Sequence, residues 1–158
     1  AQRLNDAFGA AYPDVLAAGW QLLHITGERS ELPDPAVRGY VVRRYIDRMD
    51  YAFAVADAIV SRSGAATVSE ISALGIPAVY VPYAVGNGEQ SLNAASAVAA
   101  GAAVVIPDAD LDADRVRSEI LPLISDRARI ARMREASVGV GTRHGTENVI
   151  ALIDRALV

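Results

Sequence analysis

The segment Ser61-Arg62-Ser63-Gly64-Ala65-Ala66-Thr67-Val68-Ser69-Glu70 has the residue types and spacing of an anion-binding turn. Small side chains let a ligand approach the backbone, and a helix that starts here presents free N–H groups and a positive dipole end. A diphosphate could bind there without a lysine. Glu70 lies one turn further along, where a carboxylate could accept hydrogen bonds from two ribose hydroxyls.

The same residues are consistent with an ordinary helix start, because Thr67-x-x-Glu70 has the spacing of a capping box. The two interpretations differ in where the helix begins. A capping box places Thr67 just before the helix, whereas a phosphate-binding turn places the start near Gly64.

A second polar segment, residues 82–90, also follows a predicted strand. Gln90 and Asn93 are three residues apart on the helix that follows, so their side chains project together. Amide side chains both donate and accept hydrogen bonds, which suits sugar hydroxyls. Taken alone, this segment is more typical of a solvated loop and helix start than of a sugar-binding site.

Two further sets of residues could bind a metal or a ligand, and a structural role is favoured for both. The alternating carboxylates of Asp108, Asp110, Asp112 and Asp114 suggest a calcium loop, but Ala113 stands where such a loop needs glycine. Carboxylates at a helix start also favour the helix dipole, so no metal is expected. His24 ends a strand inside an apolar run, which is more typical of a core histidine than of a ligand-binding one.

The composition limits the chemistry. There is no cysteine, which excludes disulfides and thiolate nucleophiles, and no lysine, which excludes a Walker A loop and Schiff-base chemistry. A net charge of −4 argues against a nucleic-acid partner. No apolar run reaches the roughly 18 residues that a membrane span needs.

Hydrophobic periodicity alternates between strand and helix along the whole chain. The predicted strands cover residues 20–26, 39–42, 58–60, 78–81 and 103–106, and the predicted helices cover 2–18, 48–56, 65–74, 90–100, 113–124, 127–137 and 146–157. Asp47 is the predicted cap of the second helix. Short apolar strands that alternate with helices predict a doubly wound, Rossmann-like α/β fold with a parallel sheet. Ligands of such sheets bind beyond the carboxyl ends of the strands.

The segments "SRSGAATVSEISALGIPAVYVPY", "EQSLNA" and "AGAAVVI" closely resemble the carboxyl-terminal half of the bacterial MurG glycosyltransferases. The resemblance covers nearly the whole chain. Enzymes of this family transfer N-acetylglucosamine (GlcNAc) from UDP-GlcNAc to the lipid-linked muramyl-pentapeptide of peptidoglycan synthesis. The resemblance implies a GT-B architecture in which residues 1–158 are the UDP-GlcNAc-binding domain. It also implies that this domain is truncated at its amino terminus and that the acceptor-binding domain is absent.

The resemblance also implies roles for individual residues. Ile46 would contact the uracil through its backbone. Ser63, Gly64, Ala65, Ala66 and Thr67 would surround the diphosphate and the sugar, Glu70 would hold the ribose, and Gln90 with Asn93 would read the GlcNAc hydroxyls. The family usually has two glutamines where this chain has Glu89-Gln90, and the loop at residues 84–88 also differs from the commoner forms.

The implied reaction is an inverting transfer without a covalent intermediate, a metal or a cofactor. Its general base would lie in the other domain, so no catalytic residue is assigned and the isolated chain is expected to be inactive. The full enzyme would be a peripheral protein on the cytoplasmic face of the cell membrane, with roles in cell wall biogenesis, cell shape and cell division. Two alternatives are a separate donor-binding subunit of a two-subunit transferase and a non-catalytic nucleotide-binding module.

Overall fold

The computed structural model describes residues 2–83, 88–141 and 145–156. In chain order its elements are α1 (Gln2–Ala17), β1 (Leu22–Ile25), β2 (Tyr40–Arg43), α2 (Met49–Val55), β3 (Ile59–Ser61), α3 (Ala65–Leu74), β4 (Ala78–Tyr80), α4 (Glu89–Ala99), β5 (Ala103–Val105), the 3-10 turn η1 (Asp108–Asp110), α5 (Ala113–Arg115), the π-helical η2 (Val116–Ile120), α6 (Leu121–Ser125), α7 (Arg127–Ser137) and α8 (Gly145–Ala156). Every predicted helix and strand is present, with ends within two residues of the prediction.

All the strand pairs in the described part of the chain are parallel, which confirms the predicted fold class. The strands form two separate sheets, one of β1 and β2 and one in the order β3-β4-β5. The sequence could not reveal this division, because hydrophobic periodicity identifies strands without showing which of their edges pair.

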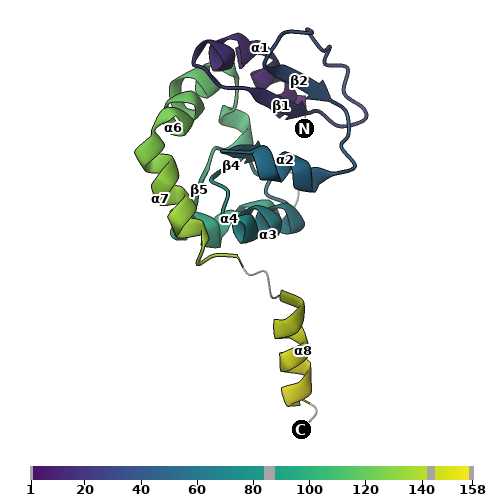
Figure 1. Cartoon of the computed structure of the whole chain (residues 1–158), viewed down its shortest axis with the longest axis vertical. Helices are drawn as coiled ribbons and strands as arrows, with labels where there is room; N and C mark the ends of the chain where they lie inside the picture. Colours follow the sequence, from purple (N-terminus) through teal and green to yellow (C-terminus); the bar gives the residue numbers. More distant parts are fainter. Residues whose placement is uncertain (1, 84–87, 142–144, 157–158) are drawn as a thin grey trace.

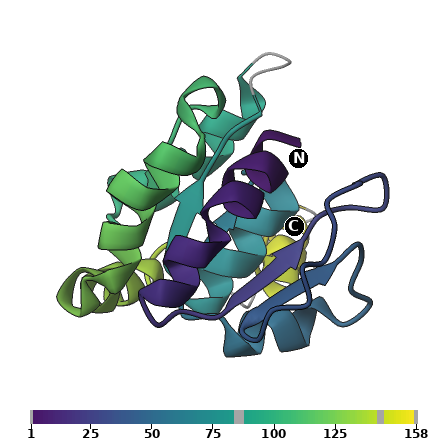
Figure 2. The ribbon, with the colours of Figure 1, turned by 90° about the horizontal axis from the view of Figure 1, so that it is seen from above.

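The three-stranded sheet is covered on both faces, because successive side chains of a strand point to opposite sides. Val79 and Val81 pack with Phe8 of α1 and with the helices that follow β5. Ala78 and Tyr80 pack on the other face, against helices α3 and α4. Figure 2 shows α1 lying between those later helices and the strands β1 and β2. The side chains packed on both faces of the sheet therefore hold the carboxyl ends of β3 and β4 in place.

Two local predictions were wrong in detail. Helix α2 begins at Met49 with Arg48 in the N-cap position and no side-chain cap, so Asp47 does not cap it. The helix predicted over residues 113–124 consists of α5, η2 and α6, with a π-helical segment before Pro122. Proline has no N–H and clashes with the carbonyl four residues earlier, and a wider turn relieves that clash.

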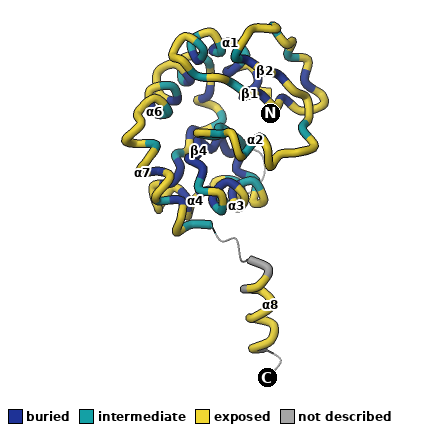
Figure 3. The backbone as a smooth tube through the Cα atoms, viewed as in Figure 1, coloured by how far each residue is buried: buried dark blue, intermediate teal, exposed yellow. Residues whose placement is uncertain are grey.

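Helix α8 extends away from the other elements (Figure 1). Its apolar side chains Val149, Ile150, Leu152 and Ile153 are exposed, and this part of the helix is yellow in Figure 3. Among the helices that the structure describes, none combines the length and the apolar character that a membrane crossing requires.

Candidate functional site

The turn between β3 and α3 has the geometry of an anion-binding helix start. Helix α3 begins at Ala65, and Gly64 holds the N-cap position with φ −63° and ψ 147° and no side-chain cap. The N–H of Val68 closes the first turn on the Gly64 carbonyl at 2.9 Å. The capping-box interpretation is therefore wrong, because Thr67 lies inside the helix. The N–H groups of Ala65, Ala66 and Thr67 have no acceptor within the helix and can serve a ligand.

Ser63 is the buried residue of this turn. Its side chain is 0% exposed, and its Oγ has no hydrogen-bond partner among the described residues. Its carbonyl accepts a hydrogen bond from Asn93 Nδ2 at 3.0 Å. A buried hydroxyl without a partner is costly, and such groups are rare in native proteins. An oxygen-rich ligand at the start of α3 would supply the missing partner.

The second polar segment meets the first through helix α4. Asn93 joins α4 to the turn at Ser63, and one turn earlier Gln90 Oε1 accepts the Tyr83 N–H at 2.9 Å. The structure therefore brings Asn93 against the predicted anion-binding turn, as the topology of a parallel sheet requires. Residues 84–87 of this segment lie outside the described residues.

Arg62 is a residue of this edge whose role was not predicted. Its Nη1 donates to the Val81 carbonyl at 3.0 Å and lies 2.5 Å from Asp108 Oδ1, an ion pair without the alignment of a hydrogen bond. Its guanidinium also lies over the Tyr83 ring, 5.3 Å from the centroid. Both members of the ion pair are largely buried, with side chains 19% and 15% exposed. Arg62 therefore ties together the segments that follow β3, β4 and β5.

Among the described residues, no hydrogen bond ties Glu70 or Ile46 to the turn at Ser63, whereas Asn93 is bonded to it. Glu70 is exposed on α3, and with Thr67 it lines the edge of a large cavity. Ile46 is half-buried and follows β2, so it belongs to the two-stranded sheet, whereas the other candidates follow β3 and β4. The predicted contacts of Glu70 and Ile46 with a nucleotide sugar stay predictions. Glu89, for which no contact is predicted, is exposed in the first turn of α4.

Three of the four aspartates that suggested a metal site have other side-chain partners. Asp112 caps α5 by accepting the Arg115 N–H at 2.7 Å, and Asp114 pairs with Arg117 at 2.8 Å. Asp108 pairs with Arg62, as described above. Within residues 2–83, 88–141 and 145–156, no three His, Cys, Asp or Glu side chains are grouped as a metal site.

His24 has a structural role in this molecule. It is 8% exposed, its Nδ1 lies 2.9 Å from the Tyr40 hydroxyl, and its Nε2 lies 3.2 Å from Asn5 Oδ1. Because an amide oxygen only accepts, Nε2 carries the proton and Nδ1 accepts from Tyr40. Burial lowers the pKa of His24 below its ordinary value. The histidine is neutral and links α1 to β1 and β2.

Comparison with solved structures supports this fold. The crystal structure of MurG from Acinetobacter baumannii superposes with a TM-score of 0.79 and 22% identity, covering 98% of this chain and 46% of that one. The parallel strands, the helices on both sheet faces and this superposition give the chain the Rossmann-like fold of one half of a GT-B structure.

Sequence comparison gives the family. The glycosyltransferase family 28 C-terminal domain matches residues 1–150, and the chain belongs to this family. Relatives from Leifsonia xyli subsp. xyli and Clavibacter sepedonicus are 50% and 48% identical over 157 residues. Both are named UDP-N-acetylglucosamine–N-acetylmuramyl-(pentapeptide) pyrophosphoryl-undecaprenol N-acetylglucosamine transferase, which confirms the resemblance to MurG. They match 99% of this chain, which covers 44% and 43% of their own lengths. The chain therefore spans less than half of these relatives.

Proposed function

We propose that residues 1–158 are the UDP-GlcNAc-binding domain of an inverting glycosyltransferase. The full enzyme would transfer GlcNAc to the lipid-linked muramyl-pentapeptide of peptidoglycan synthesis. The remaining part of a longer polypeptide would form the acceptor-binding domain. The names of the two relatives and the family match over residues 1–150 support this proposal.

One observation carries the donor-binding role: an uncapped helix start next to a buried hydroxyl that has no partner. The first turn of α3 offers backbone N–H groups, and its dipole is equivalent to roughly half a positive charge. Ser63, the residue before the Gly64 N-cap, adds a buried hydroxyl that has no partner among the described residues. A diphosphate has the charge and the number of acceptor oxygens to satisfy both.

The other predicted site residues would contact the uridine and the sugar of the donor. In this proposal Glu70 accepts hydrogen bonds from the ribose hydroxyls, and Ile46 contacts the uracil through its backbone. Gln90 and Asn93 each use one amide atom within the protein, and each amide has a second polar atom that can bond a GlcNAc hydroxyl.

The chemistry assigned to this chain is electrostatic. As the acceptor hydroxyl attacks the anomeric carbon, the bond to UDP breaks and negative charge grows on the departing diphosphate. The N–H groups from Ala65 to Thr67 would stabilise that charge because they already point at the site before reaction. The general base would come from the acceptor-binding domain. No metal or cofactor takes part in this scheme.

A lipid-linked acceptor requires contact with a membrane. We therefore place the full-length protein on the cytoplasmic face of the cell membrane, as a peripheral protein. This placement follows from the proposed acceptor.

The proposal is tested by titrating the full-length polypeptide with UDP-GlcNAc, UDP-glucose and UDP in a calorimeter. We expect UDP-GlcNAc to bind more tightly than UDP. Gln90→Ala should reduce that preference, because the lost amide would contact no part of the donor except the sugar; the Tyr83 N–H, which Gln90 Oε1 accepts, loses its partner equally whichever ligand is bound. The matched control is Gln21→Ala, an exposed glutamine before β1, which belongs to the other sheet. It should leave all three affinities unchanged.

Two results would overturn the proposal. Absence of UDP binding would remove the donor site from this turn. An equal loss of UDP and UDP-GlcNAc affinity in Gln90→Ala would contradict a sugar-reading role. The 158-residue chain by itself should show no transfer to a lipid-linked acceptor, and turnover by it would place the base in this domain.

A further inference from the structure

Tyr83, which follows β4, is held by two neighbours although much of the residue is exposed. Its N–H donates to Gln90 Oε1 at 2.9 Å, and the guanidinium of Arg62 lies over its ring, 5.3 Å from the centroid. The residue is nevertheless 50% exposed. Because Arg62 lies over one face of the ring, the opposite face is the one left for a ligand.

Arg62 is engaged within the protein and acts as the support of this ring. Its Nη1 donates to the Val81 carbonyl at 3.0 Å and pairs with Asp108, and its side chain is only 19% exposed. The other carboxylate oxygen of Asp108 lies 3.3 Å from Arg3 Nε of α1. Because these partners fix the guanidinium, the Tyr83 ring loses little freedom when a ligand stacks on it, and such preorganisation favours binding.

The contacts of Tyr83 form a closed circuit with the turn proposed for the diphosphate. Arg62 is joined to Ser63 by the chain, and the Ser63 carbonyl accepts a hydrogen bond from Asn93 Nδ2 at 3.0 Å. Asn93 lies one turn of α4 after Gln90, whose Oε1 returns to the Tyr83 N–H. Tyr83 therefore lies between the turn proposed for the diphosphate and an amide proposed for the sugar.

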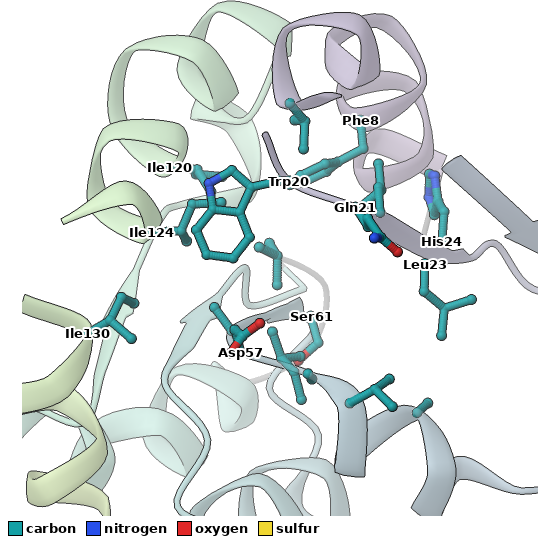
Figure 4. Close-up of a pocket in the computed structure, with 18 of the residues that line it drawn as sticks. Phe8, Trp20, Gln21, Leu23, His24, Asp57, Ser61, Ile120, Ile124 and Ile130 are labelled. Carbon is teal, nitrogen blue, oxygen red and sulfur yellow. The ribbon is translucent and has the colours of Figure 1, made fainter. Parts of the chain in front are cut away.

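The large cavity of the molecule offers a different surface. Its wall is mostly apolar, as the side chains of Phe8, Leu23 and Ile124 illustrate in Figure 4. Tyr83 and Gln90, both among the described residues, lie outside it. A ligand rich in hydroxyl groups is therefore better matched to the carboxyl ends of β3 and β4, beside Tyr83, than to this cavity.

A hexose of the glucose type has apolar faces that amide side chains do not match. Its hydroxyl and acetamido groups project around the rim of the ring, whereas C–H groups point to the two faces. An amide such as that of Gln90 suits the rim. The face of an aromatic ring carries partial negative charge, so it attracts C–H groups while it shields them from water. UDP alone lacks the hexose and gains nothing from such a contact.

We propose that Tyr83 is a specificity-determining residue of the donor site. The free face of its ring stacks on a C–H face of the transferred hexose, while Arg62 supports the other face. Gln90 then has two tasks, since one amide atom holds the Tyr83 backbone and the other can bond a rim hydroxyl. The inference rests on the proposed donor site, and it adds to that site a contact that discriminates a nucleotide sugar from the free nucleotide.

Calorimetric titration of the full-length polypeptide tests the inference. Tyr83→Ala should weaken UDP-GlcNAc binding roughly 3- to 12-fold and leave UDP binding unchanged, because only the sugar loses its aromatic partner. Tyr83→Phe keeps the ring and should bind both ligands like the wild type. The matched control is Tyr51→Ala on α2, since Tyr51 is also exposed and has Arg48 over its ring, 4.2 Å from the centroid. It should leave the preference for UDP-GlcNAc over UDP unchanged.

Two titration results would overturn the inference. A wild-type preference in Tyr83→Ala would remove the ring from the sugar, and an equal loss of affinity for both ligands would assign it to the nucleotide or to the fold. Failure of the wild type to bind UDP would refute the proposed function and this inference together, whereas these two results refute only the inference.

Nuclear magnetic resonance tests the contact directly. With tyrosines selectively labelled, the ring protons of Tyr83 are assigned by their absence from the spectrum of Tyr83→Phe. In the UDP-GlcNAc complex of the full-length polypeptide, they should show nuclear Overhauser effects to the C–H protons of the hexose. Effects to uridine protons alone, or no effect to the ligand, would contradict the stacking.

Discussion

Replacing Ser63 by alanine should raise the stability of the chain and lower its affinity for UDP. The hydroxyl is fully buried without a hydrogen-bond partner among the described residues, and alanine removes it while keeping the backbone and Cβ. An unsatisfied buried polar group costs about 1–3 kcal/mol, so the free energy of unfolding should rise by about 1 kcal/mol or more. The Asn93 bond to the Ser63 carbonyl is retained, because it involves only the backbone of residue 63.

The effect on binding has the opposite sign. A hydrogen bond to a charged group contributes about 1.5–3 kcal/mol, which corresponds to a roughly 10- to 150-fold weaker binding of UDP. Urea unfolding measures the first quantity and calorimetric titration with UDP measures the second. Ser118→Ala, at an exposed serine of η2, is the control and should change neither. A destabilised Ser63→Ala chain with wild-type affinity would show that the hydroxyl serves the fold, and the reasoning would be refuted.

Three further predictions concern other parts of the molecule. Glu70→Ala should weaken UDP binding by about 1.5–3 kcal/mol for each hydrogen bond lost, and calorimetry showing wild-type affinity would remove Glu70 from the site. Gly141→Ala should lower the free energy of unfolding in urea by about 1–3 kcal/mol or more, because the new Cβ meets the backbone of α3, whereas Gly139→Ala points into open space and should be neutral. Burial holds the pKa of His24 below 6.5, so the unfolded chain protonates first as the pH falls. Stability should therefore decline below about pH 6.5 by up to about 1.4 kcal/mol per pH unit, and His24→Asn should show a flatter dependence in urea unfolding between pH 7 and 5.

The local elements could be predicted because their signals lie within a few residues of each other. Gly75 and Gly101 marked the ends of two helices, and both adopt positive φ there, at 70° and 81°. The start of α3 could be narrowed to two alternatives, and the structure decided between them because only Gly64 has the extended backbone of an N-cap.

The long-range features could not be read in the same way. Arg62 and Asp108 are 46 positions apart, and nothing in either local pattern identifies the other as its partner. Asp108 looked like part of an acidic run, which is a helix-start signal, while its main contact is across the sheet edge. The division of the strands into two sheets could not be predicted for the same reason, because strand order depends on pairings between distant segments.

The contacts around Ser63 explain how this turn can be ready for a ligand before one binds. Asn93 holds the Ser63 carbonyl from α4, and Arg62 holds the Val81 carbonyl and Asp108 from the next two strands. Three segments that are distant in the sequence thus fix one short turn whose own side chains are too small to fix it. Preorganised N–H donors contribute most when they need no rearrangement at the moment of reaction. Because the restraint is shared, loss of the Asp108 carboxylate should loosen the turn at Ser63 even though Asp108 itself does not belong to the proposed donor contacts.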